Sequence, residues 1–125
     1  MPNKKLIDTF FKMVHINSES GEEKEFISYL KGLFTKELKA KCSIDNYGNL
    51  VVKIPAKNAT RTEPVLFGLH AGTVKPGKNI EPILKDGIIC SKGETILGAD
   101  DKAGIAELFE AIRTAEQHPP LEIVV

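Results

Sequence analysis

Tryptophan is absent from the 125 residues, and cysteine, methionine and tyrosine occur only twice each. Cys42 and Cys90 lie far apart and outside any metal-ligand spacing. This pattern favours reduced thiols in a cytoplasmic protein over a disulfide framework or a cysteine-bound metal. Seventeen basic residues balance seventeen acidic ones, so no excess of charge indicates a nucleic-acid or anionic-membrane partner.

Long apolar runs and a secretory signal are missing as well. No run approaches the roughly 20 residues that a membrane-spanning helix requires. The opening residues, MPNKKLIDTFFKMVHIN, lack both an unbroken apolar core and a small-residue cleavage site. With 42% hydrophobic and 27% charged residues, the composition is that of an ordinary globular domain that is large enough to bury a core.

Hydrophobic periodicity predicts three helices, over residues 4–15, 21–38 and 97–117. Ser20 and Glu23 have the spacing of a capping box before the second helix. Strands are expected in CSIDNYGNLVVKIP, as a hairpin in IEPILKDGIIC, and in the terminal LEIVV, while PVLFGLH (residues 64–70) has the apolar run of a strand buried on both faces. The order of elements predicts an α/β fold with a mixed sheet. Because LEIVV reads as an interior strand but comes last, we expect a domain that is cut or unfinished.

The stretch GLHAGTVKPGKN, residues 68–79, permits a phosphate-loop interpretation. Gly72, Gly77 and Lys78 fit the pattern G-x-x-x-x-G-K. Asn79 replaces the serine or threonine that would hold Mg²⁺, and Pro82 soon follows in place of a helix. These departures favour turn glycines over a nucleotide site.

The same stretch also permits a metal interpretation. His70 follows an apolar strand, and ligands bind at the carboxyl ends of strands in open α/β sheets. Asp100 and Asp101 form an adjacent acidic pair before the third helix, where a divalent cation would remove their repulsion. A structural histidine and a capping aspartate explain the same residues, so spacing alone leaves both explanations open.

A family resemblance favours the metal. VLFGLHAGTVKPG and IEPILKDGIICSKGETILGADDKAGIAELFEAI resemble the N-terminal part of the peptidase T group of metallopeptidases, a superfamily that also holds carboxypeptidase G and acetylornithine deacetylase. The resemblance implies a three-layer α/β/α catalytic sandwich that carries two Zn²⁺ ions and hydrolyses short peptides such as tripeptides. It also implies that His70 binds one metal, that Asp100 bridges both, and that the Asp100–Asp101 peptide is cis.

The chain departs from this family in two places. Where the family has an aspartate that orients the ligand histidine, this chain has Gly72. The Gly-Glu-Glu segment that follows the strand resembling LEIVV, with its general base and further ligands, is not among the 125 residues. His15 and His118 are expected to face solvent and do not replace these groups.

We therefore expect residues 1–125 to be part of a catalytic domain, without the lid or dimerisation domain, and to be inactive alone. No catalytic residue is assigned, and the metal ligands are His70 and Asp100. The alternative is a non-catalytic α/β module that acts through protein association, such as a homo-oligomer formed through an exposed sheet edge.

Overall fold

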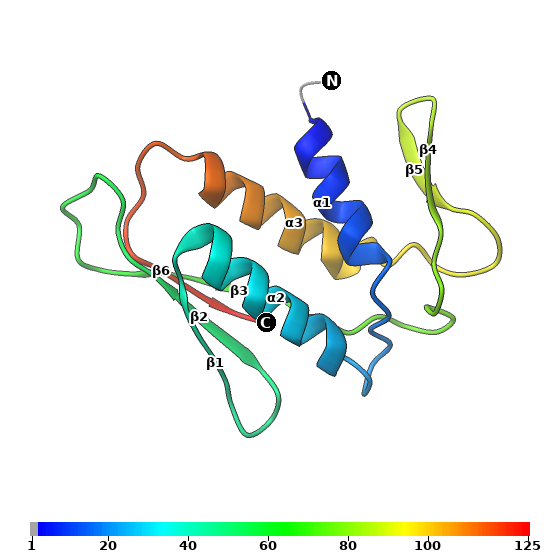
Figure 1. The fold of residues 1–125 in the computed structure, drawn as a ribbon, viewed down its shortest axis with the longest axis horizontal. Coiled ribbons are helices and arrows are strands. Elements are labelled where there is room, and N and C mark those ends of the chain that lie inside the picture. The colour runs from blue at the N-terminus through cyan, green and yellow to red at the C-terminus, as the bar shows by residue number, and fades with distance from the viewer. Residues whose placement is uncertain (1–2) are drawn as a thin grey trace. The chain divides into compact units, whose positions relative to one another are not determined.

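The computed structural model describes residues 3–125 (Figure 1). Helices and strands follow in the order α1 (Lys4–Val14), α2 (Lys24–Leu38), β1 (Lys41–Ile44), β2 (Leu50–Ile54), β3 (Val65–Gly68), β4 (Pro82–Lys85), β5 (Ile88–Ser91), α3 (Ala99–Thr114) and β6 (Leu121–Val124). The predicted helices and strands are confirmed, with ends that differ by a few residues. Within residues 3–125, no helix combines the length and the apolar character needed to cross a bilayer.

The chain divides into two compact units. In the described residues, the first unit comprises 3–26 and 71–107, and the second comprises Ile27–His70 and Leu108–Val125. Helices α2 and α3 contribute residues to both units. Each unit has its own buried apolar side chains, which include Phe10, Met13, Val14, Phe26, Ile80 and Ile105 in the first and Leu30, Phe34, Leu50, Val52, Phe109 and Ile123 in the second.

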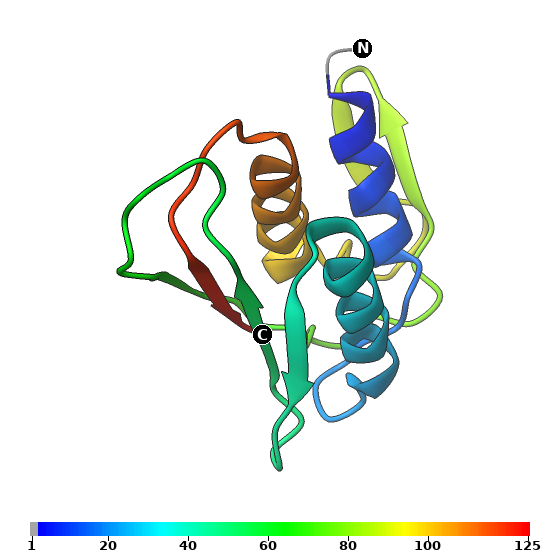
Figure 2. The same cartoon turned by 60° about the vertical axis from the view of Figure 1, so that its left-hand side comes forward.

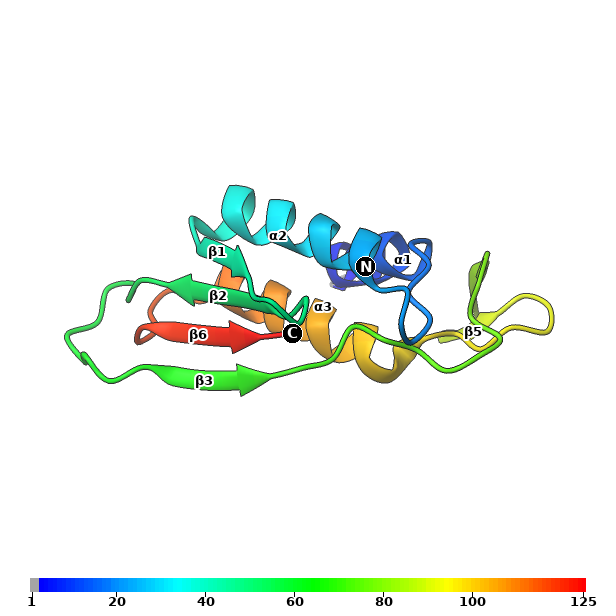
Figure 3. The same cartoon turned by 90° about the horizontal axis from the view of Figure 1, so that it is seen from below.

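The second unit is built on a four-stranded sheet in the order β1-β2-β6-β3. β2 pairs antiparallel with β1 and β6, whereas β3 runs parallel to β6, so the sheet is mixed and the predicted α/β fold is confirmed. Figure 3 shows the part of α2 in this unit along one face of the sheet. Leu50, Val52 and Ile54 alternate with more exposed residues along β2, as expected for a strand with one buried face.

The prediction that PVLFGLH is buried on both faces is wrong. In β3, Leu66 is 65% exposed and Phe67 is 36% exposed. β3 is an edge strand of the sheet, with β6 as its neighbour. An apolar run therefore indicated the strand correctly but did not reveal its position in the sheet.

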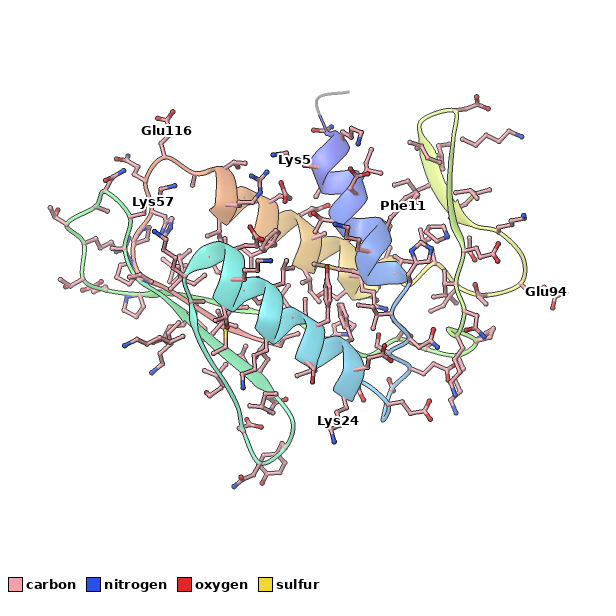
Figure 4. The ribbon with its side chains drawn as sticks, in the orientation of Figure 1. Lys5, Phe11, Lys24, Lys57, Glu94 and Glu116 are labelled. Carbon is pink, nitrogen blue, oxygen red and sulfur yellow. The ribbon has the colours of Figure 1, made fainter. Side chains whose placement is uncertain are left out.

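The two long connections of the second unit are tied together. Lys57 and His118 exchange backbone hydrogen bonds of 2.9 Å in each direction. The Nζ of Lys57 donates to the carbonyl of Ala115 at 2.7 Å, and the Nδ2 of Asn58 donates to the carbonyl of Glu116 at 3.0 Å. Figure 4 shows Lys57 and Glu116 in these neighbouring loops. The exit of α3 is thus fixed against the loop that follows β2.

The first unit contains α1, the β4–β5 hairpin and the beginning of α3. The hairpin turns at Asp86 and Gly87, both with positive φ, as the Asp-Gly pair predicted. Figure 2 shows the hairpin beside α1. Ile89 of the hairpin, Leu6 and Phe10 of α1 and Ala103 of α3 line one apolar depression.

The predicted capping box at Ser20 and Glu23 is wrong. Helix α2 begins at Lys24. The Oγ of Ser20 instead donates to the carbonyl of Thr73 at 3.3 Å, and the backbone N–H of Ser20 donates to the same carbonyl at 2.9 Å. The hydroxyl of Ser20 thus bonds to a carbonyl that is distant in sequence, whereas the local pattern predicted that it would cap the helix.

Candidate functional site

His70 lies two residues beyond the end of β3 and is exposed. The N–H of Leu69 donates to the carbonyl of Val124 at 2.9 Å and extends the parallel β3–β6 pairing to the residue before the histidine. The predicted place of His70 at the carboxyl end of a strand is confirmed. An imidazole at such an edge is well placed to bind a ligand.

Asp100 and Asp101 lie at the start of α3, in the first unit. Both have non-helical backbone angles, with φ −93° and ψ 97° at Asp100 and φ −121° and ψ 19° at Asp101. The peptide bond between them is cis, as the resemblance implied, and the Lys75–Pro76 bond is cis as well. Asp100 is exposed and Asp101 is half-buried, so one carboxylate of the pair is presented to solvent.

His70 and Asp100 belong to different units, and their convergence on a shared metal stays a prediction. Among residues 3–125, no group of three or more His, Cys, Asp or Glu side chains is placed to hold a metal ion. A zinc site in a protein takes three or four protein ligands.

The segment from Gly72 to Lys78 does not form a phosphate loop. It leads through Asn79 into strand β4, where a phosphate loop would lead into a helix. The Nζ of Lys78 lies 3.1 Å from the Oε2 of Glu22 and 3.7 Å from the Oε1 of Glu19. The hydrogen bond to Glu22 and the charges of both glutamates raise the pKa of Lys78. The Nζ of this lysine is thus paired with carboxylates of its own chain. The prediction that Gly72 and Gly77 are turn glycines is not confirmed, because neither residue lies in a turn and neither has a positive φ.

The segment after His70 packs against the α1–α2 connection within the first unit. The Oγ of Ser18 donates to the carbonyl of Ala71 at 2.8 Å. The N–H of Gly77 donates to the Oε2 of Glu19 at 3.0 Å. Ser18, Glu19 and Thr73 are buried. The side chains of Ser18 and Glu19 are paired and fix the path of the segment, as buried polar groups usually do. Thr73 is held by its backbone hydrogen bonds to Ser18 and Ser20, and its buried Oγ1 has no hydrogen-bond partner among the described residues.

Gly72 stands where the resemblance implies an aspartate, and a carboxylate from another segment lies next to it. A Cβ atom added at Gly72 would lie 3.1 Å from the Oε2 of Glu23 and 3.1 Å from the Oγ of Ser20. Glu23 is half-buried. The room for a side chain at position 72 is thus limited by two flexible polar side chains of the first unit.

Lys102 is a feature of the first unit that sequence reasoning left without a role. Its side chain is 1% exposed, its Nζ donates to the carbonyl of Ile16 at 2.6 Å, and the same nitrogen lies 4.6 Å from the ring centroid of Phe26. Burial lowers the pKa of Lys102 to about 8. The signal was present in the sequence, because Lys102 precedes the buried Ile105 by three residues and so falls on the apolar stripe of α3.

Gly77 tests how tightly the segment after His70 is packed. A Cβ at Gly77 would lie 2.8 Å from the Oγ1 of Thr73 and 2.9 Å from the carbonyl oxygen of Val74. We expect G77A to lower the free energy of unfolding by about 1–3 kcal/mol, because the backbone must shift to relieve this overlap. The matched control is G32A on exposed α2 surface, where nothing lies within 4 Å, and it should raise stability by about 0.5–1 kcal/mol. Urea unfolding followed by circular dichroism measures both, and equal effects would contradict the packing argument.

The remaining histidines lie outside the candidate segments. His15 is exposed, as predicted, and its Nδ1 lies 2.8 Å from the carbonyl of Phe11. The prediction that His118 faces solvent is wrong. His118 is half-buried, its backbone pairs with that of Lys57, and its Nδ1 lies 2.7 Å from the carbonyl of Pro119.

No family model matches the chain. Curated relatives match it in sequence over part of their own length. An uncharacterized Bacillus subtilis protein, YqjE, is 34% identical over 98% of this chain and 35% of its own length. A protein named peptidase T from Listeria welshimeri is 26% identical over 94% of this chain and 39% of its own length. The chain therefore spans little more than a third of the length of these relatives.

Solved structures of aminopeptidases also match the chain over only a part of their own length. The crystal structure of aminopeptidase PepT from Bacillus cereus superimposes with a TM-score of 0.91 at 36% identity, over 98% of this chain and 35% of that protein. A tripeptidase from Staphylococcus aureus superimposes with a TM-score of 0.85 at 30% identity, again over 98% of this chain and 35% of that protein. The fold of the chain is therefore the fold of a part of these enzymes.

Proposed function

We propose that this chain, a relative of the peptidase T aminopeptidases that matches a part of them, forms the part of a catalytic domain that supplies metal ligands for the hydrolysis of short peptides. The observation that carries the proposal is the match itself, which runs over almost the whole chain at 36% identity. Tripeptides are the proposed substrates, because one of the matched structures is described as a tripeptidase.

Within this proposal, His70 and Asp100 would hold Zn²⁺, His70 through its imidazole and Asp100 through its carboxylate, and the metal would supply a Lewis acid for peptide hydrolysis. Both residue types are ordinary zinc ligands, and both side chains are exposed in their own units. Two ligands are fewer than a zinc centre takes. We therefore propose that residues 1–125, as an isolated polypeptide, bind zinc weakly and hydrolyse no peptide. The cysteines Cys42 and Cys90 are free thiols, which fits the proposed cytoplasmic location.

A second candidate is a non-catalytic module that acts by association. The exposure of Leu66 and Phe67 on the edge strand β3 favours it, because an unpaired apolar edge can take up a strand of another chain. The occupant within this proposal is a second copy of the chain, which would form a homo-oligomer.

Calorimetric titration with Zn²⁺ separates the two candidates. We expect weak binding by the 125-residue chain that both H70A and D100A reduce by at least about 10-fold, because each removes a ligand. The matched controls are H15A and D8A, which change an exposed histidine and an exposed aspartate outside the candidate segments and should leave the affinity unchanged. Absence of heat up to millimolar zinc, together with a concentration-dependent dimer in sedimentation, would reject the metal proposal and favour the association module.

A further inference from the structure

Residues 16–20, which connect α1 to α2, contact two separate segments of the first unit. On one side, Glu19 and Thr73 form an isolated parallel bridge. The N–H of Ser20 donates to the carbonyl of Thr73 at 2.9 Å, and the N–H of Thr73 donates to the carbonyl of Ser18 at 2.9 Å. The bridge fixes the residues that come directly after His70.

On the other side, the side chain of Lys102 contacts the same connection. The ammonium donates to the carbonyl of Ile16 at 2.6 Å and lies over the ring of Phe26, which is itself fully buried. Lys102 comes two residues after Asp100, at the point where regular helical backbone angles begin in α3. The connection thus touches both the segment that follows His70 and the turn that carries Asp100.

We propose that Lys102 is a positioning residue, which locks the turn of Asp100 and Asp101 to residues 16–20 and, through them, to the segment that begins at Ala71. The inference rests on the proposed function, because the two segments are those that carry the proposed ligands.

The chemistry of the side chain supports this role. Burying an ammonium group removes its hydration and costs free energy, whereas a methionine of similar length would fill the same space at no such cost. The cost of burying this lysine is therefore offset by the two groups that its charge contacts, a backbone carbonyl and an aromatic ring. Both partners lie in the α1–α2 region, so the contact joins two parts of the first unit that are distant in sequence.

The test is amide hydrogen exchange in the variant K102M, measured by NMR. We expect exchange at the N–H groups of Ser20 and Thr73 to become about 10-fold faster, the size that the loss of a hydrogen bond from a charged donor can produce. The N–H of Val125, which donates to the carbonyl of Leu50 in the second unit, should be unchanged. The matched variant K12M removes an exposed lysine of α1 and should leave all three amides unchanged.

Exchange at Ser20 and Thr73 that stays within about twofold of the unchanged chain in folded K102M would overturn the proposal. Should K102M not fold, K102R carries the same measurement, because a guanidinium keeps the charge but displaces the donor.

Zinc titration adds the functional readout. We expect K102M to weaken zinc binding by about 10-fold, the loss typical when a group that orients a ligand is removed. A merely structural lysine would leave this affinity unchanged. If the unchanged chain binds no zinc at all, the proposed function fails, while the exchange of Ser20 and Thr73 still decides whether Lys102 couples the two segments.

Discussion

Replacement of Phe34 by alanine should lower the free energy of unfolding by about 3–5 kcal/mol, the cost typical of truncating a buried aromatic side chain. Phe34 is fully buried in the second unit, and its ring lies 5.8 Å from the ring of Phe109 at an interplanar angle of 56°. Alanine would remove this tilted aromatic pair and leave a cavity between α2 and α3. Both rings belong to the second unit, so the cavity would lie within a single core.

Urea unfolding followed by far-ultraviolet circular dichroism measures the effect of F34A. The matched control is Y47A, which truncates another aromatic side chain but at a position that is 93% exposed, in the β1–β2 turn. Y47A should change the free energy of unfolding by less than about 0.5 kcal/mol. A loss below about 1 kcal/mol for F34A would mean that the pair with Phe109 contributes little to the core.

The elements that local patterns predict well are those whose evidence lies within one segment. The helical spacing of Phe10 and Val14 reports a buried face directly, and these residues are buried in α1. The Asp86–Gly87 pair determines a hairpin turn through its backbone preferences alone. The cis peptide at Asp100–Asp101 could not be read from local patterns and came from the resemblance.

The features that sequence reasoning missed depend on partners far away in the chain. The exposure of Leu66 follows from the place of β3 at the sheet edge, which depends on pairing with β6 more than fifty residues later. Ser20 bonds to Thr73 instead of the helix that it precedes. For Lys102, the sequence showed that the residue lies on the apolar stripe of α3. It did not show the hydrogen-bond acceptor, which is the carbonyl of Ile16. These features depend on tertiary contacts, which local patterns in a single sequence do not predict.

Gly72 is the position where the resemblance and the structure together lead to the most specific prediction. The resemblance implies that an aspartate here would orient the ligand histidine. The structure shows that its Cβ would lie 3.1 Å from the carboxylate of Glu23. An aspartate at this position should therefore have two opposite effects, one on metal binding and one on the stability of the zinc-free chain.

We expect G72D to raise the affinity for Zn²⁺ by about 10–100-fold, the range typical of gaining such an orienting carboxylate. The matched variant G72N has the same shape without the charge and should gain much less affinity for zinc.

In the absence of zinc at pH 7, G72D should be less stable than G72N by about 0.5–1 kcal/mol, because its carboxylate and that of Glu23 repel each other. This difference in stability between G72D and G72N should be present when both carboxylates are ionised and should disappear when acid protonates them, below a pH of about 4. Adding E23Q to G72D should recover the stability at pH 7 and keep the gain in affinity. Equal zinc affinities for G72D and G72N would show that position 72 does not orient a metal ligand, and the assignment of His70 would lose its support.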